Sequence, residues 1–144
     1  MAYGTPPTGT PRHRVVTLQA TYYILTGLWP LVHFASFELV TGPKTDDWLV
    51  RMVGLLVVLI GVTLAVAIIR DAVHRLEITV LAAGATLAFS FIDTWYALSG
   101  RISRIYLADA VLELALLAAL IFTNRSRPEN SKASKPSARI DSVG

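Results

Sequence analysis

Four long apolar segments alternate with short polar ones along the chain. Apolar residues dominate 15–40, 49–69, 77–99 and 104–122, and each of these segments has few charged positions. An α-helix rises about 1.5 Å per residue, so roughly 20 residues cross the ~30 Å hydrocarbon core of a bilayer. The pattern predicts an all-α protein, a four-helix transmembrane bundle that occupies residues 15–122.

The segments outside the bundle have the composition of tails and turns. Residues 1–14 hold three prolines and two glycines, and residues 123–144 are polar and basic. Neither segment has enough apolar surface to bury, so both are predicted to be disordered tails. Short polar turns at 41–48 and 99–104 and a charged connector at 70–75 separate the four spans.

Composition narrows the classes of function. The 144-residue chain is 53% hydrophobic and 16% charged, which is typical of a membrane protein and not of a soluble domain. It has no cysteine, which excludes a disulfide framework and a thiolate metal site. No phosphate-binding loop, dinucleotide fingerprint or serine hydrolase elbow occurs in it. We therefore expect no cofactor and no metal centre.

Basic residues are concentrated in the segments predicted on one side of the membrane. Nine Lys and Arg lie in the two tails and the 70–75 connector, against four around the two opposite loops. Cytoplasmic segments carry the excess of Lys and Arg, so both termini are predicted to be cytoplasmic, in a multi-pass protein of the cell membrane (plasma or inner membrane). The basic C-terminal tail is expected to contact anionic lipid heads of the bilayer, and no nucleic acid.

Four acidic or basic side chains lie at least four residues from either end of a predicted span: His33, Asp93, Asp109 and Glu113. An acid at a helix centre costs roughly 2.5–3.5 kcal/mol to insert, whereas one large apolar residue contributes only about 0.3–0.6 kcal/mol in favour. If the outer surface lies near Phe37, Ser99 and Ile105, then His33, Asp93 and Asp109 each lie ~6–9 Å below it, and Glu113 lies one turn deeper. Neighbouring helices run in opposite directions, so this shared depth does not follow from sequence position. It predicts one pocket that opens outward.

Helical spacing predicts which side chains share a face. Tyr106, Asp109 and Glu113 follow one another at intervals of three and four residues, which puts them on one stripe of the fourth span. Trp29, in the first span, and Tyr106 are predicted to supply an apolar wall for the pocket. Pro30 is predicted to kink the first span near its end.

The rim of the pocket and the packing of the second span are predicted in the same way. Glu38, Lys44, Arg51 and Arg101 fall at or beside the outer ends of spans, where charged side chains usually form a solvated face. Gly54 and Gly61 lie on one stripe of the second span. Small residues on one stripe allow helix backbones to approach closely, so the second span is predicted to be a packing helix.

Two interpretations of the intramembrane acids and His33 stay open. These groups can hydrogen-bond between helices as structural contacts, or they can form a ligand or proton site. The leading interpretation is an outward-side acidic pocket that binds or moves a small cationic or lipid-like ligand. The alternatives are an intramembrane acid–base enzyme for an apolar substrate, with His33 as proton partner, and a structural or accessory subunit of a membrane complex. A path through one protomer would be narrow, so a transporter is expected to be a homodimer.

The sequence also resembles known groups. The runs YYILTGLWP, SFELVTGPKTDDWLVRMVG and FIDTWYALSGRISRIYLADAVLEL cover residues 22–30, 36–54 and 91–114. They resemble a group of small bacterial membrane proteins with no assigned activity, which implies a four-helix membrane protein. Four spans with buried acids are also similar to the EXPERA group, which includes sterol isomerases and sterol-binding receptors, although no motif aligns residue by residue.

Single-cysteine labelling checks the predicted topology. The chain has no cysteine of its own, so one introduced cysteine reports one position. Thr45→Cys and Ser99→Cys are expected to react with an impermeant maleimide on intact cells, because the Lys/Arg count places both loops outside. Ser126→Cys is expected to react only after permeabilisation. The reverse pattern would contradict the predicted orientation.

Overall fold

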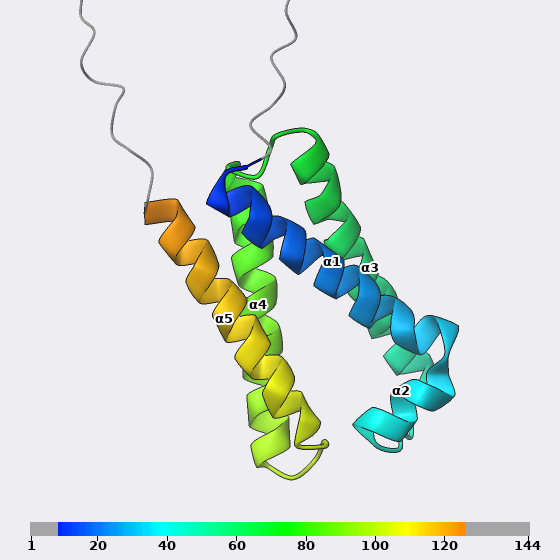
Figure 1. The fold of residues 1–144 in the computed structure, drawn as a ribbon. Helices are drawn as coiled ribbons and strands as arrows, with labels where there is room; N and C mark the ends of the chain where they lie inside the picture. Colours follow the sequence, from blue (N-terminus) through cyan, green and yellow to red (C-terminus); the bar gives the residue numbers. More distant parts are fainter. Residues whose placement is uncertain (1–8, 126–144) are drawn as a thin grey trace, which may run out of the picture.

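The computed structural model describes residues 9–125, and within that range it is entirely helical. Four long helices run alternately in opposite directions, and a short one lies across one end (Figure 1). The helices are α1 (Pro11–Val32), α2 (Phe34–Thr41), α3 (Asp47–Ile69), α4 (Leu76–Leu98) and α5 (Ile105–Arg125). The predicted all-α, four-helix transmembrane bundle is confirmed, because all four long helices are apolar and long enough to cross a membrane.

The two ends of the bundle differ. At one end, here called the terminal end, α1 begins, α5 finishes and a loop joins α3 to α4 (Figure 1). At the other, here called the α2 end, lie α2, the loop before α3 and the turn between α4 and α5. Which end faces the cytoplasm stays a prediction. The predicted tails fall largely outside the described residues, in 1–8 and 126–144.

The first helix begins at Pro11, four residues before the predicted start of the first span at position 15. Thr10 is its N-cap, and its Oγ1 accepts a hydrogen bond from the His13 N–H (3.3 Å). Proline is favoured in the first helical turn because its missing N–H is not needed there. The composition of this segment indicates disorder, whereas the cap and the proline together define a helix start.

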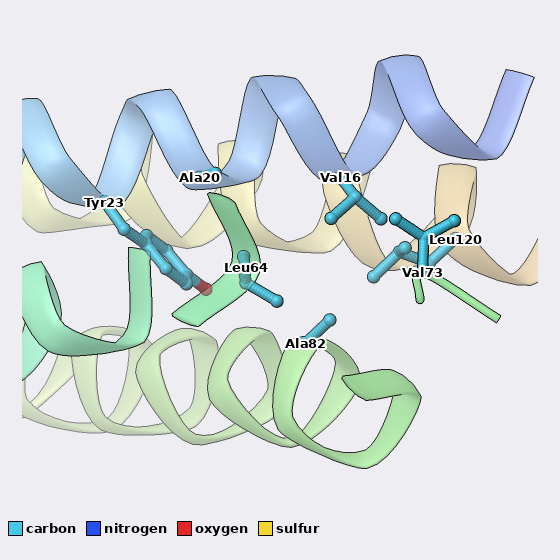
Figure 2. Packing of buried hydrophobic residues seen from close by; sticks show 7 residues of the cluster. All are labelled: Val16, Ala20, Tyr23, Leu64, Val73, Ala82 and Leu120. Atoms are coloured by element: carbon cyan, nitrogen blue, oxygen red, sulfur yellow. The ribbon is translucent and has the colours of Figure 1, made fainter. Parts of the chain in front are cut away.

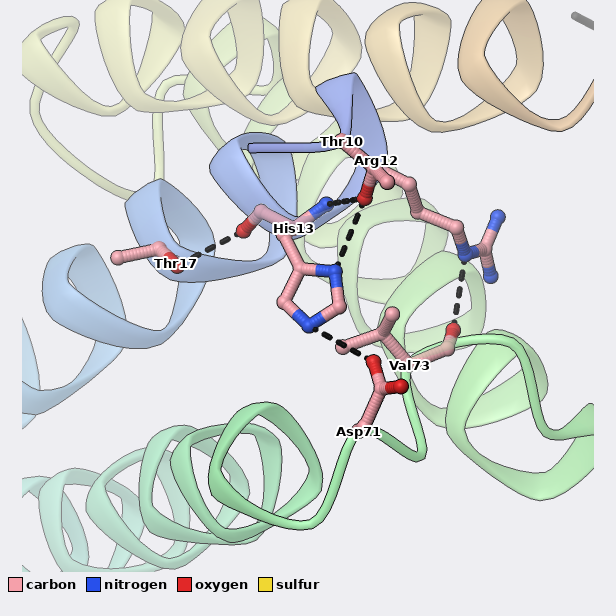
Figure 3. A network of polar contacts seen from close by, with 6 residues as sticks. All are labelled: Thr10, Arg12, His13, Thr17, Asp71 and Val73. Carbon is pink, nitrogen blue, oxygen red and sulfur yellow. Dashed lines mark hydrogen bonds and ion pairs between the residues drawn. The ribbon is translucent and has the colours of Figure 1, made fainter. Parts of the chain in front are cut away.

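Residues of this first turn hold α1 to the α3–α4 loop at the terminal end (Figure 3). Arg12 is buried, and its Nε donates to the Val73 carbonyl at 2.8 Å. His13 Nε2 lies 3.2 Å from Asp71 Oδ1. Arg12 also donates to Thr79 Oγ1 on α4 (2.6 Å), so one side chain ties α1 to both the loop and the next helix.

The first predicted span, 15–40, is divided in two. Helix α1 ends at Val32, His33 adopts a non-helical backbone (φ −141°, ψ 75°), and α2 starts again at Phe34. Pro30 has no N–H to donate to the carbonyl four residues earlier, which weakens the helix just before the break. The other three long helices begin and end within three residues of their predicted bounds.

Helices α1 and α3 touch through glycine. A Cβ placed on Gly54 would lie 2.7 Å from the Gly27 carbonyl oxygen, and one on Gly27 would lie 2.6 Å from the Gly54 carbonyl oxygen. A Cβ on Gly61 would lie 3.0 Å from the Ala20 carbonyl oxygen. The predicted role of α3 as a packing helix is therefore confirmed. It packs against the face of α1 that carries Ala20 and Gly27.

A cluster of buried apolar side chains fills the terminal half of the bundle. Figure 2 shows it at the junction of the four long helices and the α3–α4 loop. Its members are Val16, Ala20, Tyr23, Leu64, Val73, Ala82 and Leu120. Towards the α2 end the α1–α3 pair and the α4–α5 pair separate, and a cavity opens between them.

Replacement of Gly54 tests the glycine contact. Gly54→Ala is expected to lower the free energy of unfolding by about 1–3 kcal/mol, because the new methyl group would meet backbone that can yield only if the helices separate. Gly84→Ala is the matched control, since a Cβ there meets nothing within 4 Å and alanine favours a helix. Thermal unfolding in one detergent compares the two. A Gly54→Ala midpoint equal to that of Gly84→Ala would contradict the close contact.

Candidate functional site

A cavity of about 430 Å³ lies between the two helix pairs at the α2 end. All four long helices, α2 and both loops of this end contribute to its wall. Helix α3 supplies an apolar side that includes Val53 and Val57, and α4 adds Phe89 and Ile92. The volume falls within the range of roughly 300–1,000 Å³ that is usual for ligand pockets.

The three intramembrane acids meet in this cavity. Asp93 of α4 and Asp109 and Glu113 of α5 line it, together with Tyr106. Asp93 and Asp109 both lie close enough to Glu113 for their charges to interact with it. The structure thus brings together four of the residues proposed as ligand-binding, while their binding role stays a prediction.

His33 and Trp29 lie outside this cavity. His33 is exposed, and its Nδ1 accepts a hydrogen bond from the Ser36 N–H (3.2 Å), which caps the start of α2. Trp29 Nε1 donates to Ser36 Oγ (2.8 Å), and its ring packs edge-on against Phe37. The helical spacing that puts His33 on the pocket face ends with α1 at Val32, so the side chain takes another direction.

The predicted rim residues also surround the cavity without lining it. Glu38 Oε1 accepts the backbone N–H of Lys44 (2.8 Å), Arg51 lies over the Phe34 ring, and Arg101 is exposed in the α4–α5 turn. Lys44 itself does line the cavity. The sequence places it on the rim, and nothing in the pattern distinguishes it from its charged neighbours.

Tyrosines of α1 hold two of the acids. The Tyr23 hydroxyl donates to Glu113 Oε2 at 2.9 Å, and the Tyr22 hydroxyl donates to Asp109 Oδ1. Gln19 Nε2 in turn donates to the Tyr23 hydroxyl (3.3 Å) and to the Ala82 carbonyl of α4 (2.9 Å). The sequence signal for these contacts is helical spacing, since Tyr22 and Tyr23 follow Gln19 by three and four residues, although neither tyrosine is among the predicted pocket residues.

Asp93 differs from the other two acids. The residue is only 9% exposed, and no hydrogen bond or ion pair joins its side chain to another residue of 9–125. Its carboxyl oxygens are exposed to the cavity that Asp93 lines, where a carboxylate can bind a proton, water or a cation. Asp109 and Glu113 each receive a tyrosine hydroxyl, although a carboxylate can accept several hydrogen bonds. The described donors therefore satisfy only part of what the three carboxyls can accept.

The polar lining ends at Tyr23 and Glu113. Beyond them Thr86 and Ser90 are buried on α4, but each hydroxyl donates to a carbonyl of its own helix, at 2.8 and 2.6 Å respectively. The apolar cluster of Figure 2 then fills the bundle up to the terminal end. The described part of one protomer forms a closed-ended pocket, and no continuous polar path crosses it.

Within residues 9–125, no three His, Cys, Asp or Glu side chains are arranged to hold a metal ion. Comparison of the chain with protein-family models, with curated proteins and with solved structures finds no match.

Removal of the Tyr23 hydroxyl tests the link between α1 and α5. Tyr23→Phe is expected to destabilise the protein by about 1–3 kcal/mol, because Glu113 stays buried and loses its donor. Glu113→Leu is expected to destabilise the Tyr23→Phe variant less than it destabilises the wild type, since the two side chains share one hydrogen bond. Tyr96→Phe, at an exposed tyrosine of α4, is the control and should leave the unfolding midpoint unchanged. Additive effects of Tyr23→Phe and Glu113→Leu would contradict the coupling.

Proposed function

We propose that the protein binds a small amphipathic cation in this cavity, from the α2 end of the bundle. The observation that carries the proposal is Asp93, a largely buried residue whose carboxyl faces a ligand-sized cavity and has no partner among the described residues. A cationic amine supplies both the charge and the hydrogen-bond donors that this carboxyl lacks.

The balance of charge in the cavity favours a cation. Three acids line it and Lys44 is its one basic lining residue. In surroundings of low dielectric constant, like charges close together strongly repel unless a proton or a counter-ion intervenes. A bound ammonium group near the acids reduces this repulsion, whereas a bound anion would increase it.

The rest of the lining favours an apolar body attached to the charge. Val53, Val57, Phe89 and Ile92 present hydrocarbon on the α3 and α4 sides of the cavity. Burial of apolar ligand surface there contributes roughly 25 cal/mol per Å², so affinity does not depend on the charge alone. These features describe an amphipathic amine better than a hydrated inorganic ion.

The predicted topology indicates the side of the membrane from which the ligand would enter. The Lys/Arg count places the α2 end outside a cell membrane, so the ligand would enter from the outer side. Movement of the ligand across the membrane would need a path past the apolar cluster, which a homodimer or a second conformation would have to supply. Binding is the step that one protomer supports.

No observation favours the acid–base enzyme to the same degree. That alternative uses His33 as the partner of a buried carboxyl, and His33 instead caps α2 outside the cavity. An accessory subunit explains the Tyr22 and Tyr23 contacts as structural, but it leaves Asp93 without a role.

Charge-removing substitutions test the proposed function. Native mass spectrometry from nanodiscs is expected to show one hexylammonium per wild-type protomer and no binding of neutral hexanol. Asp93→Asn is expected to weaken hexylammonium binding at least about tenfold, the loss of one charge-assisted contact, while the unfolding midpoint stays equal or rises. Asp109→Asn should likewise be tolerated in stability, because an amide oxygen still accepts the Tyr22 hydroxyl.

Glu77→Gln is the matched control for this experiment, because Glu77 is exposed on α4 at the terminal end. It removes the same charge without touching the cavity, so hexylammonium affinity should not change. Equal affinity in the wild type and in Asp93→Asn, or equal binding of hexanol, would overturn the proposed function.

A further inference from the structure

Lys44 occupies the mouth of the acidic cavity. It belongs to the loop between α2 and α3, and its Nζ lies 5.1 Å from the centre of the Tyr106 ring and 5.9 Å from that of Phe37. All three residues line the cavity. The one lining cation therefore lies at the opening, on the same side of α5 as the acids below it.

The backbone around Lys44 holds it in this place. Its N–H donates to Glu38 Oε1 (2.8 Å), and its Nζ donates to the Thr41 carbonyl (3.1 Å). Gly42, between these residues, has a φ of +89°, a conformation that side chains other than glycine rarely adopt. The loop thus turns sharply at Gly42. As a result, the Lys44 side chain folds back towards the end of α2 and does not extend into solvent.

The ammonium group of Lys44 makes no ion pair within residues 9–125. Of its three N–H donors one goes to a carbonyl, and its remaining contacts are the two aromatic rings. Glu38 of α2 accepts the backbone N–H of Lys44 and makes no ion pair with its ammonium group. The charge is positioned, partly shielded from water and free to accept an anionic group.

We propose that the ligand of this cavity is a zwitterion, with its ammonium group at Asp93, Asp109 and Glu113 and its anionic oxygen group at Lys44. The inference rests on the proposed function, since it assigns the second charge of the same ligand. Tyr106 marks the level of Lys44, and Asp109 and Glu113 follow it by three and seven residues. At about 1.5 Å per residue, the two charged groups of the ligand lie roughly 5–10 Å apart along α5.

Two sources offer this chemistry. One is the headgroup of an aminophospholipid, in which a phosphate and an ammonium are joined by a short stem. The other is a water-soluble molecule with an amine at one end and a phosphate or carboxylate at the other. Both carry an anionic group for Lys44 and an amine for the acids, so the experiment has one arm for each.

The first arm uses nanodiscs without aminophospholipid and compares aminohexyl phosphate with hexylammonium by native mass spectrometry. The wild type is expected to bind aminohexyl phosphate about tenfold more tightly, the gain of one charge-assisted contact. Lys44→Gln is expected to abolish this preference while hexylammonium binds at least as well as before. Lys44→Arg should restore the preference because it keeps the charge, and Arg51→Gln, at an exposed cation outside the lining, should leave it unchanged.

The second arm replaces part of the nanodisc lipid with phosphatidylethanolamine. Retention of one such lipid per protomer, lost in Lys44→Gln, would identify the lipid headgroup as the source. Binding of aminohexyl phosphate alone would identify a soluble zwitterion.

Each contrary result has a distinct meaning. A wild type that binds both soluble probes equally, and retains no phosphatidylethanolamine, would overturn the zwitterion. So would a Lys44→Gln variant that gains affinity for both probes alike, since Lys44 would then act only as a tethered counter-ion for the acids. If hexylammonium fails to bind the wild type at all, the proposed function itself fails, whatever the result for Lys44.

Discussion

The backbone contact between Gly27 and Gly54 is the constraint on which the rest of the arrangement depends. It locks α1 against α3 at a separation where no side chain fits, so the rotation of α1 about its own axis is fixed. With that face packed on α3, Tyr23, one helical turn before Gly27, lies beside the contact and reaches Glu113 of α5. Tyr22 reaches Asp109 from the same stretch of helix. The position of the acidic cavity therefore follows from a contact that contains no polar side chain.

The sequence predicts well what depends on regular helix geometry. Asp109 and Glu113 reach one wall of one cavity because nothing interrupts the helical spacing of α5 between them. Asp93 joins them because antiparallel helices of similar length put it at a similar depth. Both inferences need only the rise per residue and the ends of the helices, and these ends were predicted to within three residues for α3, α4 and α5.

The same reasoning fails where the backbone departs from a helix. His33 and Lys44 exchange their expected positions: the first lies outside the cavity and the second on its wall. His33 is displaced by a single non-helical residue, and Lys44 is directed by the positive φ of Gly42 and a backbone contact to Glu38. Side-chain periodicity carries no information about either event. Local features near them, such as Pro30 and the Gly-Pro pair, indicate that the helix changes course but not in which direction.

The positions of hydrogen-bond donors and acceptors on the helices show that a structural role and a ligand-binding role for the acids are compatible. The α4–α5 pair carries all three carboxyls, whereas the hydroxyls that bind two of them come from α1. Helices α4 and α5 alone would expose these acids to lipid, so the docking of α1 stabilises them, and Asp109 and Glu113 act as interhelical contacts. That explanation does not extend to Asp93, which is 9% exposed and receives no donor from any described helix. A structural role accounts for two of the acids, and the third is accounted for by the proposed cation in the cavity that all three share.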